Sequence, residues 1–164
     1  MADLTDNIGI ERRDGRHVRE VVDDLPLFDG FGGAELNSLS SYFRAFQANA
    51  GAQIFSEGDP GEFLCVVVSG AVEVLKEDQQ GVAHVVATVG AGKTLGEMAL
   101  IDREPRSGTA RVARPSELLV LTRESFEKLA GEHPRLALQF TFTIARLLSK
   151  RLRLASGMLV DHLG

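Results

Sequence analysis

A change in the spacing of apolar residues constrains the fold of this chain more than any other feature. Short apolar runs of strand length follow one another through the middle of the sequence, at residues 63–68, 71–76, 84–89 and 117–121. Glycine-containing turns such as Ser69-Gly70 separate these runs, which is typical of a small sandwich or barrel. The apolar residues of 34–46, and those beyond Thr122, have helical spacing instead. The spacing therefore predicts a β-rich body between helical segments.

These patterns predict an α+β chain, mainly β, in the order helix, roll of strands, two helices. The first C-terminal helix is expected over residues 125–132. Pro134 suits the first turn of a longer helix that runs to about Ala155. The chain is expected to divide into a flexible or loosely docked N-terminal segment, a folded domain that includes the last helix, and a C-terminal tail: residues 1–24, 25–155 and 156–164.

The charge balance and the single cysteine exclude several classes of function. The 164 residues carry 18 Lys and Arg against 23 Asp and Glu, and phosphate neutralisation needs a positive face, so binding to nucleic acid by this domain alone is not expected. No window approaches the ~18 apolar residues of a membrane span, and no secretory leader opens the sequence. We therefore expect a cytoplasmic protein without membrane contact. One cysteine, Cys65, and four scattered histidines give neither a disulfide nor a metal site, which counts against a cupin-type metalloenzyme.

The clearest chemistry lies in residues 92–112. Arg106 follows Pro105 at the mouth of a predicted strand, where its guanidinium could clasp a phosphate in two hydrogen bonds. A short helical turn is expected over residues 98–101, and its first amides suit an anion. Glu97 lies at the first turn of that helix, and because a carboxylate repels phosphate it must face neutral donors such as sugar hydroxyls. The pair indicates a ribose-phosphate site.

This stretch resembles the phosphate-binding cassette of cyclic-nucleotide-binding domains, the module of catabolite activator protein, of the regulatory subunits of cAMP-dependent protein kinase and of cyclic-nucleotide-gated channels. The matching residues are Gly96-Glu97-Met98-Ala99-Leu100 and Pro105-Arg106-Ser107-Gly108-Thr109-Ala110. Upstream, residues 55–62 resemble the family's turn before its third strand, and residues 68–70 resemble the end of that strand. The resemblance covers about residues 25–154, and its motifs agree in order and spacing.

The resemblance implies an eight-stranded β-roll, a jelly-roll-like double-stranded β-helix, with an N-terminal helix, a short phosphate-cassette helix and two C-terminal helices. It implies cAMP or cGMP as ligand, with no cofactor, no metal and no catalytic residue. Arg106 would hold the cyclic phosphate and Glu97 the ribose 2′-hydroxyl. Gly96 would let the backbone approach the sugar. The remaining implied phosphate contacts are Ser107 and the amides of Met98 and Ala99.

Two residues depart from the family's usual cassette. Gly108 stands where alanine is usual, and we expect it to loosen the cassette. Ser107 occupies the position where, in some members, threonine favours cGMP and alanine favours cAMP. A serine serves either nucleotide, so both stay open, and we favour cAMP.

The last predicted helix, the family's lid and signalling element, carries two apolar stripes. One stripe faces the roll: Leu136, Phe140, Ile144 and Leu148. The other closes over a purine or pairs with another subunit to give a homodimer: Leu148, Leu152, Ala155 and Leu159. Arg151 lies near the expected pocket and is a further ligand-binding candidate, because its guanidinium could stack on the base. The alternative places Arg151 on a solvated face, with Arg146, Lys150 and Arg153.

We therefore predict a cyclic-nucleotide sensor, a regulatory domain and not an enzyme, that signals by moving its C-terminal helix. No output domain is recognisable in the sequence, so the signal would pass to an unidentified protein effector in trans or to a missing output domain of a longer chain.

Three alternatives remain open from the sequence. The first is a ligand-free β-roll that serves as a protein–protein interaction module. The second is a simple ion pair between Arg106 and Glu97. The third is a small phosphate-handling enzyme built around Lys93, since residues 87–94 resemble the phosphate loop of nucleotide triphosphatases with Ala87 in place of the first glycine. That loop requires an α/β setting, so we interpret residues 92–94 as the turn before the cassette.

Overall fold

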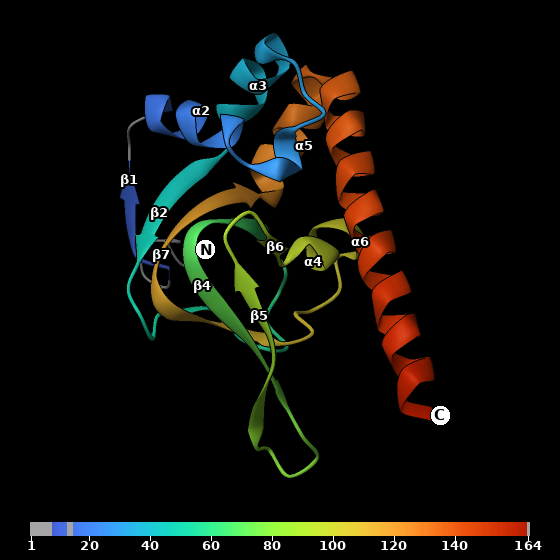
Figure 1. Cartoon of the computed structure of the whole chain (residues 1–164). Helices are drawn as coiled ribbons and strands as arrows, with labels where there is room; N and C mark the ends of the chain where they lie inside the picture. Colours follow the sequence, from blue (N-terminus) through green and yellow to red (C-terminus); the bar gives the residue numbers. More distant parts are fainter. Residues whose placement is uncertain (1–7, 13–14, 164) are drawn as a thin grey trace.

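A roll of antiparallel strands forms the body of the molecule, with helices gathered at one end and along one side (Figure 1). The computed structural model describes residues 8–12 and 15–163. The strands are β1 (Ile10–Arg12), β2 (Arg44–Ala48), β3 (Gln53–Phe55), β4 (Phe63–Glu77), β5 (Ala83–Gly90), β6 (Thr94–Leu95) and β7 (Thr109–Thr122). The helices are α2 (Gly15–Asp23), the 3₁₀ turn η1 (Pro26–Phe28), α3 (Gly33–Ser40), α4 (Glu97–Asp102), α5 (Arg123–Glu132) and α6 (Pro134–Leu163).

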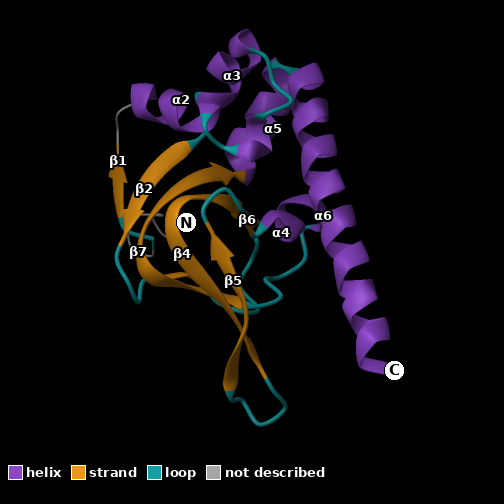
Figure 2. Ribbon diagram, viewed as in Figure 1, coloured by secondary structure: helices purple, strands orange, loops and turns teal. Residues whose placement is uncertain are grey.

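The α+β roll expected from the sequence is confirmed, but a count of eight strands is not. The described residues form one 7-stranded sheet in the order β1-β2-β7-β4-β5, with β3 also paired to β7 and β6 to β4. Strands β4 and β7 are 15 and 14 residues long, and the register of their pairing shifts between Val67 and Val72. These long strands bend around the roll without a break, so each contributes to both of its sides (Figure 2).

The central strands are apolar on both faces, which explains why their sequences form continuous apolar runs. In β4, Leu64 and Val66 pack against the helices, whereas Cys65 and Val67 point into the roll. Successive side chains of a strand point to opposite faces, so a strand buried on both faces needs apolar residues at every position. One core therefore lies inside the roll and a second lies between the roll and the helices.

The helical end is held by a cluster of aromatic side chains. The rings of Phe28 and Phe43 meet edge to face at 5.6 Å, and Phe43 meets Phe140 of α6 at 6.0 Å. Val18 and Val22 of α2 are buried in the same cluster. Part of the segment expected to be flexible or loosely docked is therefore packed onto the body as α2, while residues 1–7 and 13–14 lie outside the described part.

Helix α6 begins at Pro134, as expected, and continues to Leu163 instead of ending near Ala155. Its first half is buried against the other helices through Leu136, Phe140 and Ile144. Its second half runs past the cassette and away from the roll (Figure 1). In the described part of the chain, no helix has both the length and the hydropathy needed to cross a bilayer.

The buried thiol of Cys65 gives a test of the packing inside the roll. The side chain is fully buried, and desolvation raises the pKa of its thiol to about 12. Thiolate is the reactive form, so at pH 8 the folded protein is expected to leave Cys65 unmodified by a disulfide reagent such as DTNB. Full modification is expected only in denaturant. Rapid stoichiometric labelling of the folded protein would show that the strand is not packed as described.

Candidate functional site

A cavity of about 420 Å³ lies between the roll, the cassette helix α4 and helix α6. All seven residues predicted to bind a ligand line it: Gly96, Glu97, Met98, Ala99, Arg106, Ser107 and Arg151. Residues 87–89 of β5, with Phe55, Val74 and Lys93, complete much of its wall. The structure thus brings together both halves of the predicted cassette, at residues 96–99 and 106–107, and Arg151 of the last helix. Arg151 lies more than 40 positions further along the chain.

Arg106 is a buried cation at one end of this cavity. Its side chain is 3% exposed and lies between two phenyl rings, with the guanidinium carbon 4.0 Å from the centre of Phe55 and 4.7 Å from that of Phe63. It donates hydrogen bonds to the carbonyl oxygens of Gly96 at 3.0 Å and Phe63 at 2.6 Å. Burial lowers the pKa of Arg106. Within the described residues, no carboxylate pairs with it, and its Nε has no hydrogen-bond partner.

The backbone of Arg106 is fixed by the glycine-containing turn that the sequence singled out. The amide of Arg106 donates to the carbonyl of Asp59, and the amide of Gly58 donates to the carbonyl of Arg106, both at 2.8 Å. On the other side, the Lys76 ammonium of β4 donates to the carbonyl of Ser107 at 2.7 Å. The upstream turn and the cassette are therefore two parts of one structure, which explains why both motifs occur together.

Glu97 faces the same cavity from the first turn of α4. Its carboxylate is 3% exposed, with Oε1 paired to Arg151 and Oε2 without any hydrogen-bond partner in the described residues. Gly96, just before it, adopts a left-handed backbone with φ of 77°. A Cβ at Gly96 would lie 2.5 Å from Nη1 of Arg106, so glycine is needed for both the backbone angle and the close approach.

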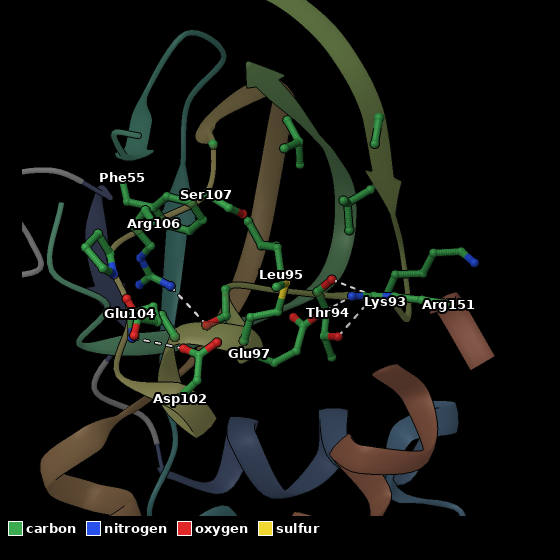
Figure 3. Close-up of a pocket in the computed structure, with 18 of the residues that line it drawn as sticks. Phe55, Lys93, Thr94, Leu95, Glu97, Asp102, Glu104, Arg106, Ser107 and Arg151 are labelled. Carbon is green, nitrogen blue, oxygen red and sulfur yellow. Dashed lines mark hydrogen bonds and ion pairs between the residues drawn. The ribbon is translucent and has the colours of Figure 1, made fainter. Parts of the chain in front are cut away.

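Arg151 lines the cavity from α6, although its side chain remains 39% exposed. Its guanidinium pairs with Glu97 and donates to Thr94, at 2.8 Å to the carbonyl oxygen and 3.2 Å to the hydroxyl. Figure 3 shows Arg106 and Arg151 approaching from opposite sides, with Glu97 and Thr94 between them. The alternative of a direct Arg106–Glu97 ion pair is wrong, since the ion-pair partner of Glu97 is Arg151.

The phosphate loop suggested by residues 87–94 is not formed. Lys93 lies in the short turn between β5 and β6, and the six-residue helix α4 starts only at Glu97. A nucleotide triphosphatase loop joins a strand to a long helix in an α/β sheet, whereas this sheet is antiparallel. The described residues also hold no group of three or more His, Cys, Asp or Glu side chains arranged for a metal ion.

Gly108 does not simply loosen the cassette, as its departure from the family pattern suggested. A Cβ at this position would lie 2.9 Å from the carbonyl oxygen of Leu75 and 3.3 Å from Cγ1 of Val74. Gly108 is itself buried, and the adjacent strand β4 leaves little room for a methyl group. In this chain the glycine permits a closer contact between the cassette and β4.

Sequence analysis missed the groups that hold Arg106 and α4 in place. Four side chains contact the cassette from outside it. Three of them precede it by 20 to 50 residues, and the fourth follows it: Phe55, Phe63 and Lys76, and then Arg123. Phe55 begins the turn at residues 55–62 that the sequence marked, and Phe63 follows that turn directly, but neither was assigned to the site. Lys76 and Arg123 fall in no local pattern that points to the site.

Comparisons with known proteins find a family and several relatives. The family model of the cyclic nucleotide-binding domain matches residues 45–133. The chain is 36% identical over 128 residues to the cyclic AMP receptor protein of Thermus thermophilus, covering 78% of this chain and 57% of that protein. It is 35% identical over 107 residues to lysophospholipase NTE1 of Chaetomium globosum, covering 65% of this chain but only 7% of that protein.

Solved structures show the same similarity in three dimensions. The crystal structure of a cyclic nucleotide-binding domain from Methylobacillus flagellatus KT matches with a TM-score of 0.77 at 31% identity, covering 90% of this chain and 83% of that one. By contrast, the chain spans little more than half of the receptor protein and a small part of the lysophospholipase, 57% and 7% respectively.

The tight contact at Gly108 gives a test that needs no ligand. We expect Gly108→Ala to lower the free energy of unfolding by about 1–3 kcal/mol, because the added methyl group overpacks against β4. Urea denaturation measures this change. Gly90→Ala is the matched control, since nothing lies within 4 Å of a Cβ at that position. Equal stability of the two variants would mean that the cassette and β4 are not in close contact.

Proposed function

The chain belongs to the cyclic nucleotide-binding domain family, and we propose that it binds cAMP or cGMP in the cavity between α4, β5 and α6. The buried guanidinium of Arg106, which has no carboxylate partner among the residues that the structure describes, is the single observation that carries this proposal. Domains of this family are regulatory, and we propose that this chain acts by binding and not by catalysis.

Electrostatics supports an anion beside Arg106. Taking a charge out of water costs several kcal/mol unless an opposite charge or enough hydrogen bonds compensate it. Two carbonyl oxygens and two aromatic faces supply part of this compensation but no negative charge. An arginine has five N–H donors, so several remain for a ligand, including the partnerless Nε–H. A cyclic phosphate has one negative charge and exocyclic oxygens that match this fork.

The free oxygen of Glu97 supports a ribose beside that phosphate. Oε2 is buried and needs a donor, and the 2′-hydroxyl of a ribose is a donor. Because Oε1 pairs with Arg151, the same carboxylate can hold the sugar and the last helix at once. The amides of Met98 and Ala99 and the Ser107 side chain line the same cavity and would complete the phosphate contacts.

The preference for cAMP or cGMP would depend on the side chains that line the cavity, Ser107 among them. Ser107 is exposed to the cavity, and its hydroxyl can donate or accept a hydrogen bond. We keep cAMP as the favoured ligand and cGMP as the alternative. Arg151, whose side chain is 39% exposed at the opposite end, would contact the base by stacking.

We propose that the ligand signals through α6. Arg151 ties this helix to Glu97 and Thr94, so any ligand that changes the position of Glu97 changes the contacts of α6. A ligand shifts such an equilibrium only by its different affinity for the two helix positions. The recipient would be a protein effector in trans or an output domain of a longer chain, in the cytoplasm.

The exposed half of α6 favours a second role as a contact surface. Large apolar side chains here are more than half exposed: Leu152, Leu154, Met158, Leu159, Val160 and Leu163. Exposed apolar stripes of this kind mark interaction sites. They fit the homodimer through the C-terminal helix that the sequence suggested. The alternative, a ligand-free β-roll that serves as a protein–protein interaction module, would use a different surface.

The binding proposal predicts a large effect of Arg106→Ala. Losing two charge-assisted hydrogen bonds is expected to weaken binding of cAMP or cGMP by at least about 100-fold. Isothermal titration calorimetry measures the change. Arg111→Ala is the matched control. Arg111 is an exposed arginine that pairs with Glu73, so this substitution should leave the affinity unchanged. A folded wild-type protein, free of copurified nucleotide, that binds neither nucleotide would contradict the proposal.

The role of Glu97 predicts discrimination between cAMP and 2′-deoxy-cAMP. Wild-type protein should prefer cAMP by about tenfold or more, because only the 2′-hydroxyl donates to the free Oε2. Glu97→Gln should remove most of this preference, because an amide offers a weaker acceptor. Arg151→Ala should weaken binding of both ligands yet keep their ratio. If Glu97→Gln keeps the full preference, Glu97 does not bind the ribose.

A further inference from the structure

Arg123, the first residue of α5, contacts the backbone of the cassette helix through its side chain. Its guanidinium donates to the carbonyl oxygens of Ala99 at 2.6 Å and Leu100 at 3.3 Å, and also to that of Gly61 at 2.8 Å. The side chain is 17% exposed, and its Nε lies 3.8 Å from the carboxylate of Glu62. One side chain thus joins α4, the turn before β4 and the start of α5.

The charge of Arg123 fits α4 better than α5. A cation near the N-terminus of a helix opposes the helix dipole, whereas a cation near the C-terminus complements it. Arg123 occupies the first position of α5, yet its guanidinium lies at the carbonyls of Ala99 and Leu100, the two middle residues of the six-residue helix α4. The last carbonyls of a helix lack amide partners within it, and Leu100 is buried, so its carbonyl oxygen needs such a donor. The carbonyl of Ala99 also accepts from the amide of Arg103 at 3.0 Å, and Arg123 adds a second hydrogen bond to it.

The contact between α4 and the turn is tight independently of Arg123. A Cβ at Gly61 would overlap the Ala99 side chain, so only glycine allows this approach. Arg123 donates to the carbonyls of both residues and therefore spans the junction where they touch. The amide of Arg123 adds a hydrogen bond to the carbonyl of Glu62 at 2.7 Å.

We propose that Arg123 is the positioning residue that aligns the two halves of the nucleotide site and links them to α5. The turn that it holds fixes the backbone of Arg106 through Gly58 and Asp59. The helix that it holds carries Glu97 in its first turn. Arg123 lines no part of the cavity, so it acts through these residues and not by touching the ligand. This inference rests on the proposed function for its effect on affinity.

Arg123 also gives α4 a buried connection to the α5–α6 pair. An ion pair between Arg103, at the end of α4, and Glu127 of α5 also connects the two helices. Its side chains are exposed, at 73% for Arg103 and 59% for Glu127. Exposed pairs contribute little, because water and salt screen them. Glu127→Gln therefore removes a neighbouring charge contact without touching the carbonyl contacts, and it serves as the matched control.

The test compares wild type, Arg123→Ala, Arg123→Lys and Glu127→Gln by amide hydrogen exchange of α4 and by calorimetric titration with cAMP and cGMP. In protein without nucleotide, Arg123→Ala should speed exchange in residues 97–102 while the inner strands β4 and β7 keep their protection. Its affinity should fall by at least about fivefold, the lower end of typical coupling between sites. Arg123→Lys keeps the positive charge on one ammonium group, so it should restore part of the α4 protection and part of the affinity. Glu127→Gln should match wild type.

Exchange also reports on the link to α5. Nucleotide should protect both α4 and α5 in wild type, but mainly α4 in Arg123→Ala. Unchanged α4 exchange and unchanged affinity in Arg123→Ala would overturn the inference. If wild type binds neither nucleotide, the proposed function fails, and α4 exchange alone still decides the positioning role. If Arg123→Ala does not fold, Arg123→Lys and Arg123→Gln are compared, and wild-type α4 exchange in both would overturn the inference.

Discussion

The buried guanidinium of Arg106 is the interaction on which the arrangement of this site depends. A cation that is 3% exposed and has no carboxylate partner in the described residues must be held by other groups, and the structure supplies several. Two phenyl rings flank it, two carbonyl oxygens accept hydrogen bonds from it, and the turn before β4 fixes its backbone. These groups compensate only partly for the lost water, and an anionic ligand would neutralise the buried charge directly.

Glu97 connects this anion site to the rest of the molecule. Its carboxylate has one oxygen directed to Arg151 of α6 and one without a partner, so a single buried group meets both the proposed sugar and the proposed signalling helix. The second half of α6, by contrast, has no buried residue beyond Ile144. A helix attached by few contacts near one point is suited to change position, because little packing must be lost when it moves.

The sequence predicted the roll and the cassette because both depend on local patterns. Strands buried on two faces give continuous apolar runs, and the cassette is one stretch in which Glu97 and Arg106 lie nine residues apart. It did not predict the pairing of Arg151 with Glu97 or the contacts of Arg123, because these join residues 54 and 24 positions apart. The predicted end of α6 near Ala155 was too early, although the apolar stripe on this helix already extended to Leu159. The bend of β4 and β7, which sets the strand count, arises from register shifts that apolar spacing does not encode.

The most direct measurement is an NMR titration that observes the arginine Nε–H signals, with that of Arg106 assigned from its absence in Arg106→Ala. If the partnerless Nε–H donates to a cyclic phosphate, adding cAMP or cGMP should move the Arg106 signal strongly downfield, while the exposed Arg111 stays unchanged. Saturable binding with no change at Arg106, or no binding of either nucleotide to the folded protein, would contradict the assignment of this buried arginine as the phosphate-binding group.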